Sequence, residues 1–309
     1  MQISVIVPLY NKSKYVVRAI ESILAQSDAV SEIIVVDDGS TDGGGELVQK
    51  HFADKITLIS QQNCGVSKAR NAGLAQAKSD YVAFLDADDY WYPQFISNIK
   101  QLKLAFPDAG MFCTAYEFFK DDALVKIKNP YLPVGSGIIH DYFAACCNVD
   151  LPVTASSVCI NKALLLSVGG FPESIQIGED QAVWGALACK TDIAYHSDVS
   201  VVYDLLASDS TRHFQQRLLL SPHVDLFCCL LTSDAAPSHL KESLQKLIHL
   251  SVMSCIKNNL IAGERSQAFD LLVNNDKLIW DKYRVIAFGL LILPKWLIAR
   301  FYGYARNFR

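Results

Sequence analysis

The sequence predicts an α/β fold followed by a C-terminal helical region. In the first third of the chain, short β-branched runs alternate with segments of helical periodicity. This alternation is typical of βαβ units, which build a mostly parallel sheet with helices on both faces. The runs are continuously apolar, as expected of strands buried on both faces. Beyond about residue 212 the pattern is mostly helical, with breaks at Pro222, Pro237 and Pro294.

The expected elements follow in chain order. Strands are expected at Ile3–Val7, Ile33–Val36, Thr57–Ile59 and Tyr81–Leu85, with helices at Tyr15–Gln26, Gly44–Phe52 and Ser67–Ala77. From about Asp108, strand-like pieces mix with short helices. There, strands are expected at Met111–Tyr116, Leu124–Ile127 and Val153–Ile160, and helices at Ile138–Cys146, Lys162–Val168 and Glu179–Lys190. These changes of pattern divide the chain into segments 1–110, 111–211 and 212–309.

The composition argues against a disordered protein and against a nucleic-acid binder. The chain has 309 residues, of which 51% are hydrophobic and 19% charged, so it is globular rather than disordered. Its net charge of -4 and its pI near 6.0 argue against a nucleic-acid partner, because nucleic-acid binders usually carry a basic excess.

Cysteine usage and the N-terminus indicate the compartment. The nine cysteines are scattered and form no CxxC pair, so we expect reduced, mostly buried thiols rather than a zinc site or a disulfide framework. The opening "MQISVIVPLYN" reads as a strand and lacks the charged start and long apolar stretch of a signal peptide. A cytoplasmic location is therefore expected.

Polar clusters follow all four strands of the first third. They read "PLYN" after the first strand, "DDGSTD" after the second, "QQNCG" after the third and "DADD" after the fourth. Because the carboxyl ends of parallel strands share one edge, where ligands bind in open α/β sheets, these clusters should converge on one crevice.

The residue types in these clusters suit a phosphorylated ligand. Asp86 and Asp88 lie two apart at a strand end, so both side chains can point the same way and offer oxygen ligands to Mg²⁺ or Mn²⁺. Arg70 could add a bidentate phosphate contact, or it could be a solvent-facing helix charge. Asp37 or Asp38 could accept a hydrogen bond from a nucleobase, and the alternative is an N-cap formed with Ser40 and Asp42.

Several motifs together carry a family resemblance. They are "VIVPLYNKSKYVVRAIESILAQS", "EIIVVDDGSTDGG", "QQNCGVSKARNAGLAQAKSDYVAFLDADDYW" and "GGFPESIQIGEDQAVWGAL". In this order they resemble a family 2 glycosyltransferase of the GT-A fold, and the resemblance covers about Met1–Tyr203. It implies a nucleotide-sugar-binding half at 1–110, an acceptor-binding half at 111–211, and a helical C-terminal region at 212–309.

The resemblance implies a role for each matching residue. Pro8, Tyr10 and Asn11 would frame the nucleobase, Asp37 and Asp38 would fix the base and the nearby ribose, and Arg70 and Asn71 would help hold the donor. Asp86 would contact the ribose side, and Asp88 would hold a divalent metal on the diphosphate. Glu179 and Asp180 match the acidic pair of the family, with Asp180 as catalytic base. Taken alone, Asp180 could instead be an acidic first turn favoured by the helix dipole.

The implied activity is metal-dependent transfer of a hexosyl or N-acetylhexosaminyl group, with inversion. The donor would be a nucleotide-diphosphate sugar, with a UDP-sugar expected, and the cofactor Mn²⁺ or Mg²⁺. The acceptor would be a hydroxyl of a glycan or lipid-linked glycan in cell-surface polysaccharide biosynthesis, such as lipopolysaccharide O-antigen or capsule. The alternatives are a sugar-1-phosphate nucleotidyltransferase, although "PLYNKS" stands where that class has a GxGTR-type loop, and a non-catalytic nucleotide-sugar-binding module.

Two further groups of residues are weaker candidates. Families of this type often place a histidine on the metal or diphosphate, and His196 and His213 are both available here. Thr154, Ser156 and Ser157 precede the "GGF" segment and are expected on the acceptor side.

The C-terminal tail raises the question of membrane association. Val285–Leu293 is strongly apolar, but it ends at Pro294, well short of the roughly 20 residues of a spanning helix. It is surrounded by basic and aromatic residues, namely Lys282, Arg284, Lys295, Arg300, Arg306 and Arg309, and Trp296, Phe301, Tyr302 and Tyr304. A helix lying in the interface of the inner membrane face would explain this pattern, and the alternative is a helix that packs in a core or a dimer contact.

Overall fold

The computed structural model describes residues 1–148, 150–207, 218–298 and 300. The chain divides into two compact units, Met1–Ser208 and Asp209–Arg309. Several residues named above, His213, Phe301, Tyr302, Tyr304, Arg306 and Arg309, lie outside the described residues.

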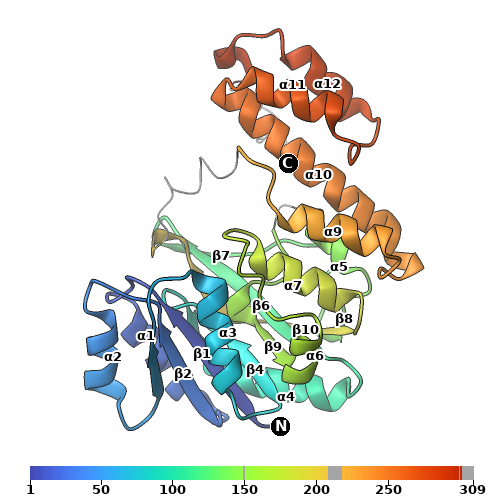
Figure 1. Ribbon diagram of the computed structural model, residues 1–309. Helices are drawn as coiled ribbons and strands as arrows, with labels where there is room; N and C mark the ends of the chain where they lie inside the picture. The colour runs from blue at the N-terminus through green and yellow to red at the C-terminus, as the bar shows by residue number, and fades with distance from the viewer. Residues whose placement is uncertain (149, 208–217, 299, 301–309) are drawn as a thin grey trace. The chain divides into compact units, whose positions relative to one another are not determined.

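The first unit opens with four parallel strands (Figure 1). They are β1 (Ile3–Leu9), β2 (Glu32–Asp37), β3 (Thr57–Ser60) and β4 (Tyr81–Phe84), in the spatial order β3-β2-β1-β4. The connecting helices are α1 (Val16–Leu24), α2 (Gly44–Phe52) and α3 (Val66–Gln76). All seven elements were expected at these places, with ends that differ by at most two residues.

Helices cover both faces of this sheet because β1 is apolar on both. Val5 and Val7 belong to one core cluster with residues of α1, α2 and α4 (Phe95–Ala105). Ile6 points the other way, toward α3, where a Cβ on Gly73 would lie 2.5 Å from Ile6 Cγ2. The absence of a side chain at Gly73 therefore lets α3 pack closely on β1, and Figure 1 shows α3, α6 and α7 in front of the strands.

The second half of the sheet is mixed rather than parallel. Its strands are β5 (Tyr90–Trp91), β6 (Met111–Lys120), β7 (Ala123–Lys126), β8 (Ser136–Ile138), β9 (Val158–Asn161) and β10 (Ile193–Asp204). β9 lies between β4 and β6 and is antiparallel to both, while β6 and β10 are parallel. The sequence did not predict β10, because "HSD" interrupts its apolar pattern, and the register shifts between His196 and Val199.

Short helices complete the first unit, namely α5 (Tyr142–Cys146), α6 (Lys162–Ser167) and α7 (Glu179–Ala188). The helix expected from Ile138 begins later because Ser136–Ile138 pairs with β10 as a strand. Asp141 caps α5 by accepting from Ala144 N at 2.8 Å. The strand expected from Val153 likewise begins only at Val158, after a 3-10 turn over Ala155–Ser157.

The second unit is helical and has its own core. It contains α9 (His223–Thr232), α10 (Lys241–Ala262), α11 (Arg265–Asn274) and α12 (Lys282–Leu290). Val252 and Ile256 of α10 pack in one cluster with Leu272 of α11 and with Ala287 and Leu290 of α12. Among the described residues, no helix combines the length and apolarity needed to cross a membrane.

All nine cysteines are free thiols. Four of them, Cys113, Cys146, Cys159 and Cys255, are buried, whereas Cys64 and Cys229 are exposed. The expectation of mostly buried thiols therefore holds for fewer than half of them.

Candidate active site

The loops after β1 and β2 are tied together at the carboxyl edge of the sheet. Asn11 N donates to Ser40 Oγ at 3.1 Å, and Asn11 Oδ1 accepts from Thr41 N at 2.8 Å. Asn11 has a φ of +51°, in the left-handed region that asparagine tolerates better than most residues. Asn11 therefore joins two loops, while the neighbouring Tyr10 is 42% exposed and Pro8 is buried in β1.

Asp37 and Asp38 organise different loops. Asp37 Oδ1 accepts from Ser40 N at 2.9 Å, within the turn that follows β2. Asp38 is buried and accepts from Gln61 Nε2 at 2.7 Å, Cys64 N at 2.9 Å and Gly65 N at 2.8 Å. Asp38 thus shapes the loop after β3, and the expected convergence of the first three polar clusters is built from these bonds.

Arg70 connects the loop after β4 to helix α7. Its side chain is only 3% exposed, and it donates from Nη2 to Asp86 Oδ1 and from Nη1 to Glu179 Oε1, both at 2.8 Å. Burial alone would lower the pKa of Arg70, but the charges of Asp86 and Glu179 raise it above its ordinary value. Arg70 therefore stays cationic, and it is a buried bridge rather than a solvent-facing charge.

Asn71, on the same helix as Arg70, binds the backbone of the segment that precedes α7. Its Nδ2 donates to Phe171 O at 2.8 Å, and its Oδ1 accepts from Phe171 N at 2.9 Å. The preceding Gly170 has a φ of +68°, and a Cβ there would lie 2.8 Å from Asn71 Oδ1. Asn71 thus fixes the "GGF" segment that leads into α7.

The three carboxylates of "DADD" occupy three different environments. Asp86 pairs with Arg70, as described above. Asp88 Oδ2 lies 2.7 Å from Lys12 Nζ, with the Asp88 side chain 19% exposed. Asp89 is buried and accepts from Ser156 Oγ at 2.5 Å and from Asp204 N at 3.0 Å. Burial, with the nearby charges of Asp86 and Asp88, raises the pKa of Asp89 well above its usual range.

The acidic pair begins helix α7. Its N-cap Gly178 has a φ of +82°, and Glu179 is buried against Arg70. Asp180 is half-buried and accepts from Gln181 N at 2.7 Å. Burial, followed by the charge of Glu179, raises the pKa of Asp180 to about 7, against the opposing effect of Arg70. Glu179 is thus held in an ion pair, and Asp180 is the member of the pair whose pKa lies near neutrality.

Asp88 fits a divalent cation only as one ligand among several. Among the described residues, no group of three or more His, Cys, Asp or Glu side chains could hold a metal by itself. A single partly exposed carboxylate, completed by phosphate oxygens and water, is an arrangement that Mg²⁺ uses. The residues therefore suit a metal that binds together with a diphosphate.

His196 lies away from this cluster. It precedes Asp204, which contacts Asp89, by eight residues on β10, or roughly 25 Å at the rise of a strand. Its Nδ1 accepts from Asp198 N at 3.2 Å. His196, one of two histidines considered for a metal contact and not assigned one, is therefore not part of this carboxylate cluster.

Sequence reasoning missed several residues that build the site. One is Lys12, whose ammonium contacts Asp88 Oδ2 at 2.7 Å. Another is Arg18, whose Nη2 donates to Asp88 O at 2.5 Å and to Asp204 Oδ2 at 2.9 Å. Asp204 could not have been found because its strand was not predicted. The expectation for Ser156 and Ser157 is wrong, because both are fully buried and Ser156 contacts Asp89 rather than an open acceptor surface.

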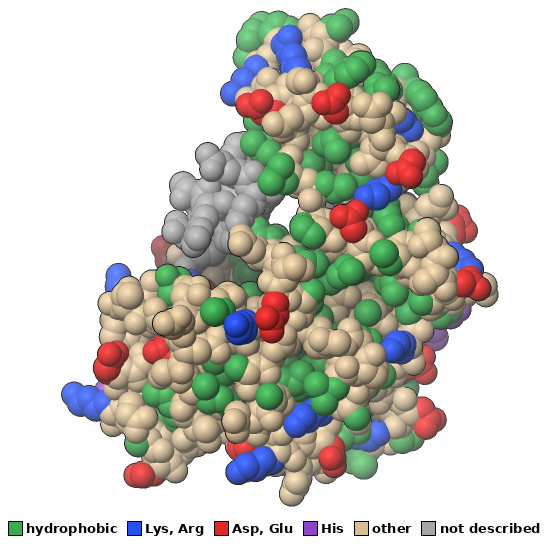
Figure 2. Space-filling view, in the orientation of Figure 1, with side chains coloured by type: hydrophobic (Ala, Val, Ile, Leu, Met, Phe, Trp, Pro, Cys, Tyr) green, Lys and Arg blue, Asp and Glu red, His purple; other side chains and the backbone are tan. Residues whose placement is uncertain are grey.

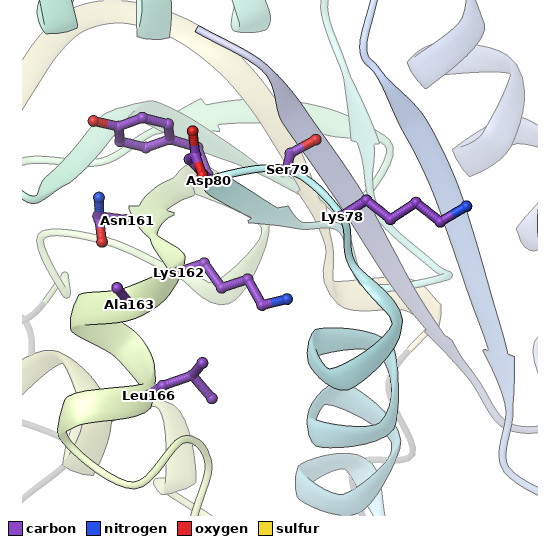
Figure 3. A pocket seen from close by; sticks show the side chains of 8 residues that line it. Lys78, Ser79, Asp80, Asn161, Lys162, Ala163 and Leu166 are labelled. Carbon is purple, nitrogen blue, oxygen red and sulfur yellow. The ribbon is translucent and has the colours of Figure 1, made fainter.

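A separate pocket lies at the opposite edge of the sheet, where β4 begins and β9 ends (Figure 3). Its lining residues are Lys78, Ser79, Asp80, Tyr81, Asn161, Lys162, Ala163 and Leu166. None of the candidate site residues belongs to it.

Part of the chain is similar in sequence to known proteins. Residues 4–142 match the sequence model of glycosyl transferase family 2. An uncharacterized glycosyltransferase of Rickettsia felis is 32% identical over 196 residues, which are 62% of this chain and 31% of the relative. An uncharacterized glycosyltransferase of a Nostoc species is 47% identical over 105 residues, 33% of each chain. The chain thus spans about a third of the length of these curated relatives.

Solved structures support the fold over nearly the whole chain. Staphylococcus aureus TarS 1-349 in complex with UDP-GlcNAc is 19% identical with a TM-score of 0.70, over 99% of this chain and 92% of that chain. The mannosyltransferase PcManGT from Pyrobaculum calidifontis, in complex with GDP-Man and Mn²⁺, is 21% identical with a TM-score of 0.61, over 94% and 85%. These likenesses show the GT-A fold with a C-terminal helical region. Residues 4–142 of the chain are therefore similar to glycosyl transferase family 2.

Proposed function

We propose that the protein is a metal-dependent glycosyltransferase that moves a sugar from a nucleotide-diphosphate donor to a hydroxyl, with inversion. One observation carries the proposal. The buried Arg70 holds Asp86, two residues before Asp88, and Glu179, next to Asp180, on one guanidinium. Asp88, which would bind the metal, and Asp180, whose pKa burial raises to about 7, each lie one or two residues from a carboxylate that Arg70 holds.

The donor would lie along the loops that follow β1, β2 and β4. Exposed Tyr10 offers an aromatic face to a nucleobase, and Asp37 and Asp38 shape the loops beside it. A UDP-sugar is the donor we favour, because the TarS structures include complexes with UDP and with UDP-GlcNAc. Asp88 would hold Mn²⁺ or Mg²⁺, which stabilises the charge on the leaving diphosphate when bound.

Asp180 would act as the general base. Its half-buried carboxylate can take the proton of the acceptor hydroxyl as the oxygen attacks the anomeric carbon and the diphosphate departs. Attack from the face opposite the leaving group inverts the configuration of the sugar. Glu179 would not compete for the proton, because its charge is paired with Arg70 at 2.8 Å.

The acceptor we propose is a glycan or lipid-linked glycan used in cell-surface polysaccharide synthesis at the inner membrane face. A surface of the second unit supports this. Trp280, Ile292 and Trp296 are 71%, 83% and 64% exposed. Lys282 and Lys295 lie among them in the sequence, and aromatic and basic residues together favour an anionic membrane interface. Figure 2 shows hydrophobic and basic side chains exposed on this unit.

Product formation from a panel of nucleotide sugars tests the function. The purified protein is incubated with each donor and Mn²⁺, and release of the nucleoside diphosphate is measured. We expect release from one donor class, loss of release in Asp180→Asn, and no change in Asp121→Asn, whose side chain is 82% exposed. Binding of a donor without release by the wild type, with or without glycan acceptors, would instead favour a non-catalytic binding module.

A further inference from the structure

An ammonium group sits where the expected metal would bind. Lys12 Nζ lies 2.7 Å from Asp88 Oδ2, and the two side chains are 26% and 19% exposed. The same ammonium lies 6.0 Å from the centre of the Tyr15 ring. A carboxylate oxygen at this distance from a cation cannot accept a divalent metal without bringing two positive charges close together.

The backbone of Lys12 is fixed, so only its side chain can yield. On one side Asn11 is bonded to Ser40 and Thr41, and on the other Ser13 N donates to Asp42 Oδ2 at 2.8 Å. The carbonyl of Lys12 accepts from Tyr15 N at 2.9 Å and from Val16 N at 3.0 Å, where α1 begins. The side chain projects from this anchored loop and remains partly solvated, so it can leave Asp88 without unfolding the loop.

We propose that Lys12 is a positioning residue that occupies Asp88 in the donor-free protein and gives it up when a metal arrives with the donor. This rests on the proposed function. The diphosphate of the donor supplies negative charge that the released ammonium can contact, so the exchange replaces one ion pair with another. Binding of metal and binding of nucleotide are thereby coupled through one lysine.

Titration with Mn²⁺ alone tests the proposal without any turnover. Free Mn²⁺ is followed by electron paramagnetic resonance with donor-free wild type, Lys12→Met and Lys14→Met. Lys14 is exposed and its loss changes the net charge equally, so it is the matched control. We expect Lys12→Met to bind Mn²⁺ about tenfold more tightly than the other two, because a competing cation is gone. Equal affinity in all three proteins would overturn the proposal.

Two additional measurements define the site and the coupling. Adding Asp88→Asn to Lys12→Met should abolish the gained affinity, and its persistence would place the ion elsewhere and contradict the proposal. UDP should increase Mn²⁺ affinity more in the wild type than in Lys12→Met, and an equal increase would also contradict it. Lys12→Gln repeats the test if Lys12→Met fails to fold. Nucleotide release by the wild type from a sugar donor is assayed separately, so that failure of the proposed function can be told apart.

Discussion

Arg70 and Glu179 are 109 residues apart in the sequence, and their side chains meet at 2.8 Å in the interior of the protein. The contact places the start of α7 beside the end of β4, because the same guanidinium also binds Asp86. A buried ion pair adds little stability over apolar residues, but breaking one is costly because an uncompensated charge remains. We therefore expect the Arg70–Glu179 pair mainly to position the start of α7 relative to the end of β4.

Replacing Arg70 should therefore cost stability as well as activity. We expect Arg70→Met to lower the free energy of unfolding by about 3–5 kcal/mol, since Asp86 and Glu179 lose their shared partner in a buried setting. Urea denaturation followed by circular dichroism measures the change. Lys68→Met, at an exposed position of the same helix, should change it little. Equal stability of the two variants would show that Arg70 is not an essential bridge.

The pKa of Asp180 predicts how transfer depends on pH. A base must be deprotonated to accept a proton, so kcat/KM should rise with pH and level off above about 7. Asp180→Asn should lower transfer by about 100-fold or more, the scale of lost general-base catalysis, and leave UDP affinity nearly unchanged. Rate profiles from pH 5 to 9 and calorimetric UDP titrations check both. Loss of UDP binding in the variant would make Asp180 a donor ligand or a structural residue instead.

Asp88 should control metal dependence. Asp88→Asn keeps the shape of the side chain but removes a charged oxygen ligand, so turnover should collapse, and EDTA should have the same effect on the wild type. Transfer rates with and without Mn²⁺ provide the measurement. Full activity of the variant in the presence of chelator would refute the assignment.

Ser156 should contribute to folding through the acidic loop. Its hydroxyl donates to Asp89 Oδ2 and accepts from Asp86 N at 3.1 Å, so Ser156→Ala removes a partner from the buried Asp89 carboxylate and from the partly buried Asp86 N–H. We expect a loss of about 1–3 kcal/mol in the free energy of unfolding. The exposed Ser167→Ala is the comparison in the same denaturation assay. A neutral Ser156→Ala would mean that water replaces the hydroxyl.

The exposed apolar surface of the second unit should control binding to membranes. Truncation before Lys282 is a poor test, because Ala287 and Leu290 belong to the core of this unit. Ile292→Ser with Trp296→Ser changes only exposed side chains and should reduce sedimentation with anionic liposomes at low salt. Binding should also weaken as salt increases, since screening shortens the field of the basic residues. A wild type that ignores such liposomes would contradict the membrane proposal.

The sequence predicted the first half of the fold well because its signals there are local. Four β-branched runs and three amphipathic segments needed only periodicity, and α2 was predicted with its observed limits, Gly44–Phe52. β10 was missed because a bulge near His196 breaks its pattern, and tertiary pairing with β6 restores it.

The sequence predicted which residues lie in the candidate site, but not which of them contact one another. Adjacent carboxylates look alike in sequence, yet Asp88 lies partly exposed beside Lys12 while Asp89 is buried beside Ser156. Such differences arise from partners 67 to 115 residues away, such as Ser156 and Asp204 for Asp89. Local pattern carries no information about pairs at that separation.

The place of β9 in the sheet has a consequence for how the protein can be made. β9 comes from residues 158–161, beyond the family match at 4–142, yet it fills the gap between β4 and β6. A nascent chain that has emerged only to residue 142 would leave β4 and β6 without β9, β6 also without β10, and Arg70 without Glu179. The first unit should therefore mature late on the ribosome, after β9 and α7 have emerged, and shorter fragments should aggregate rather than fold.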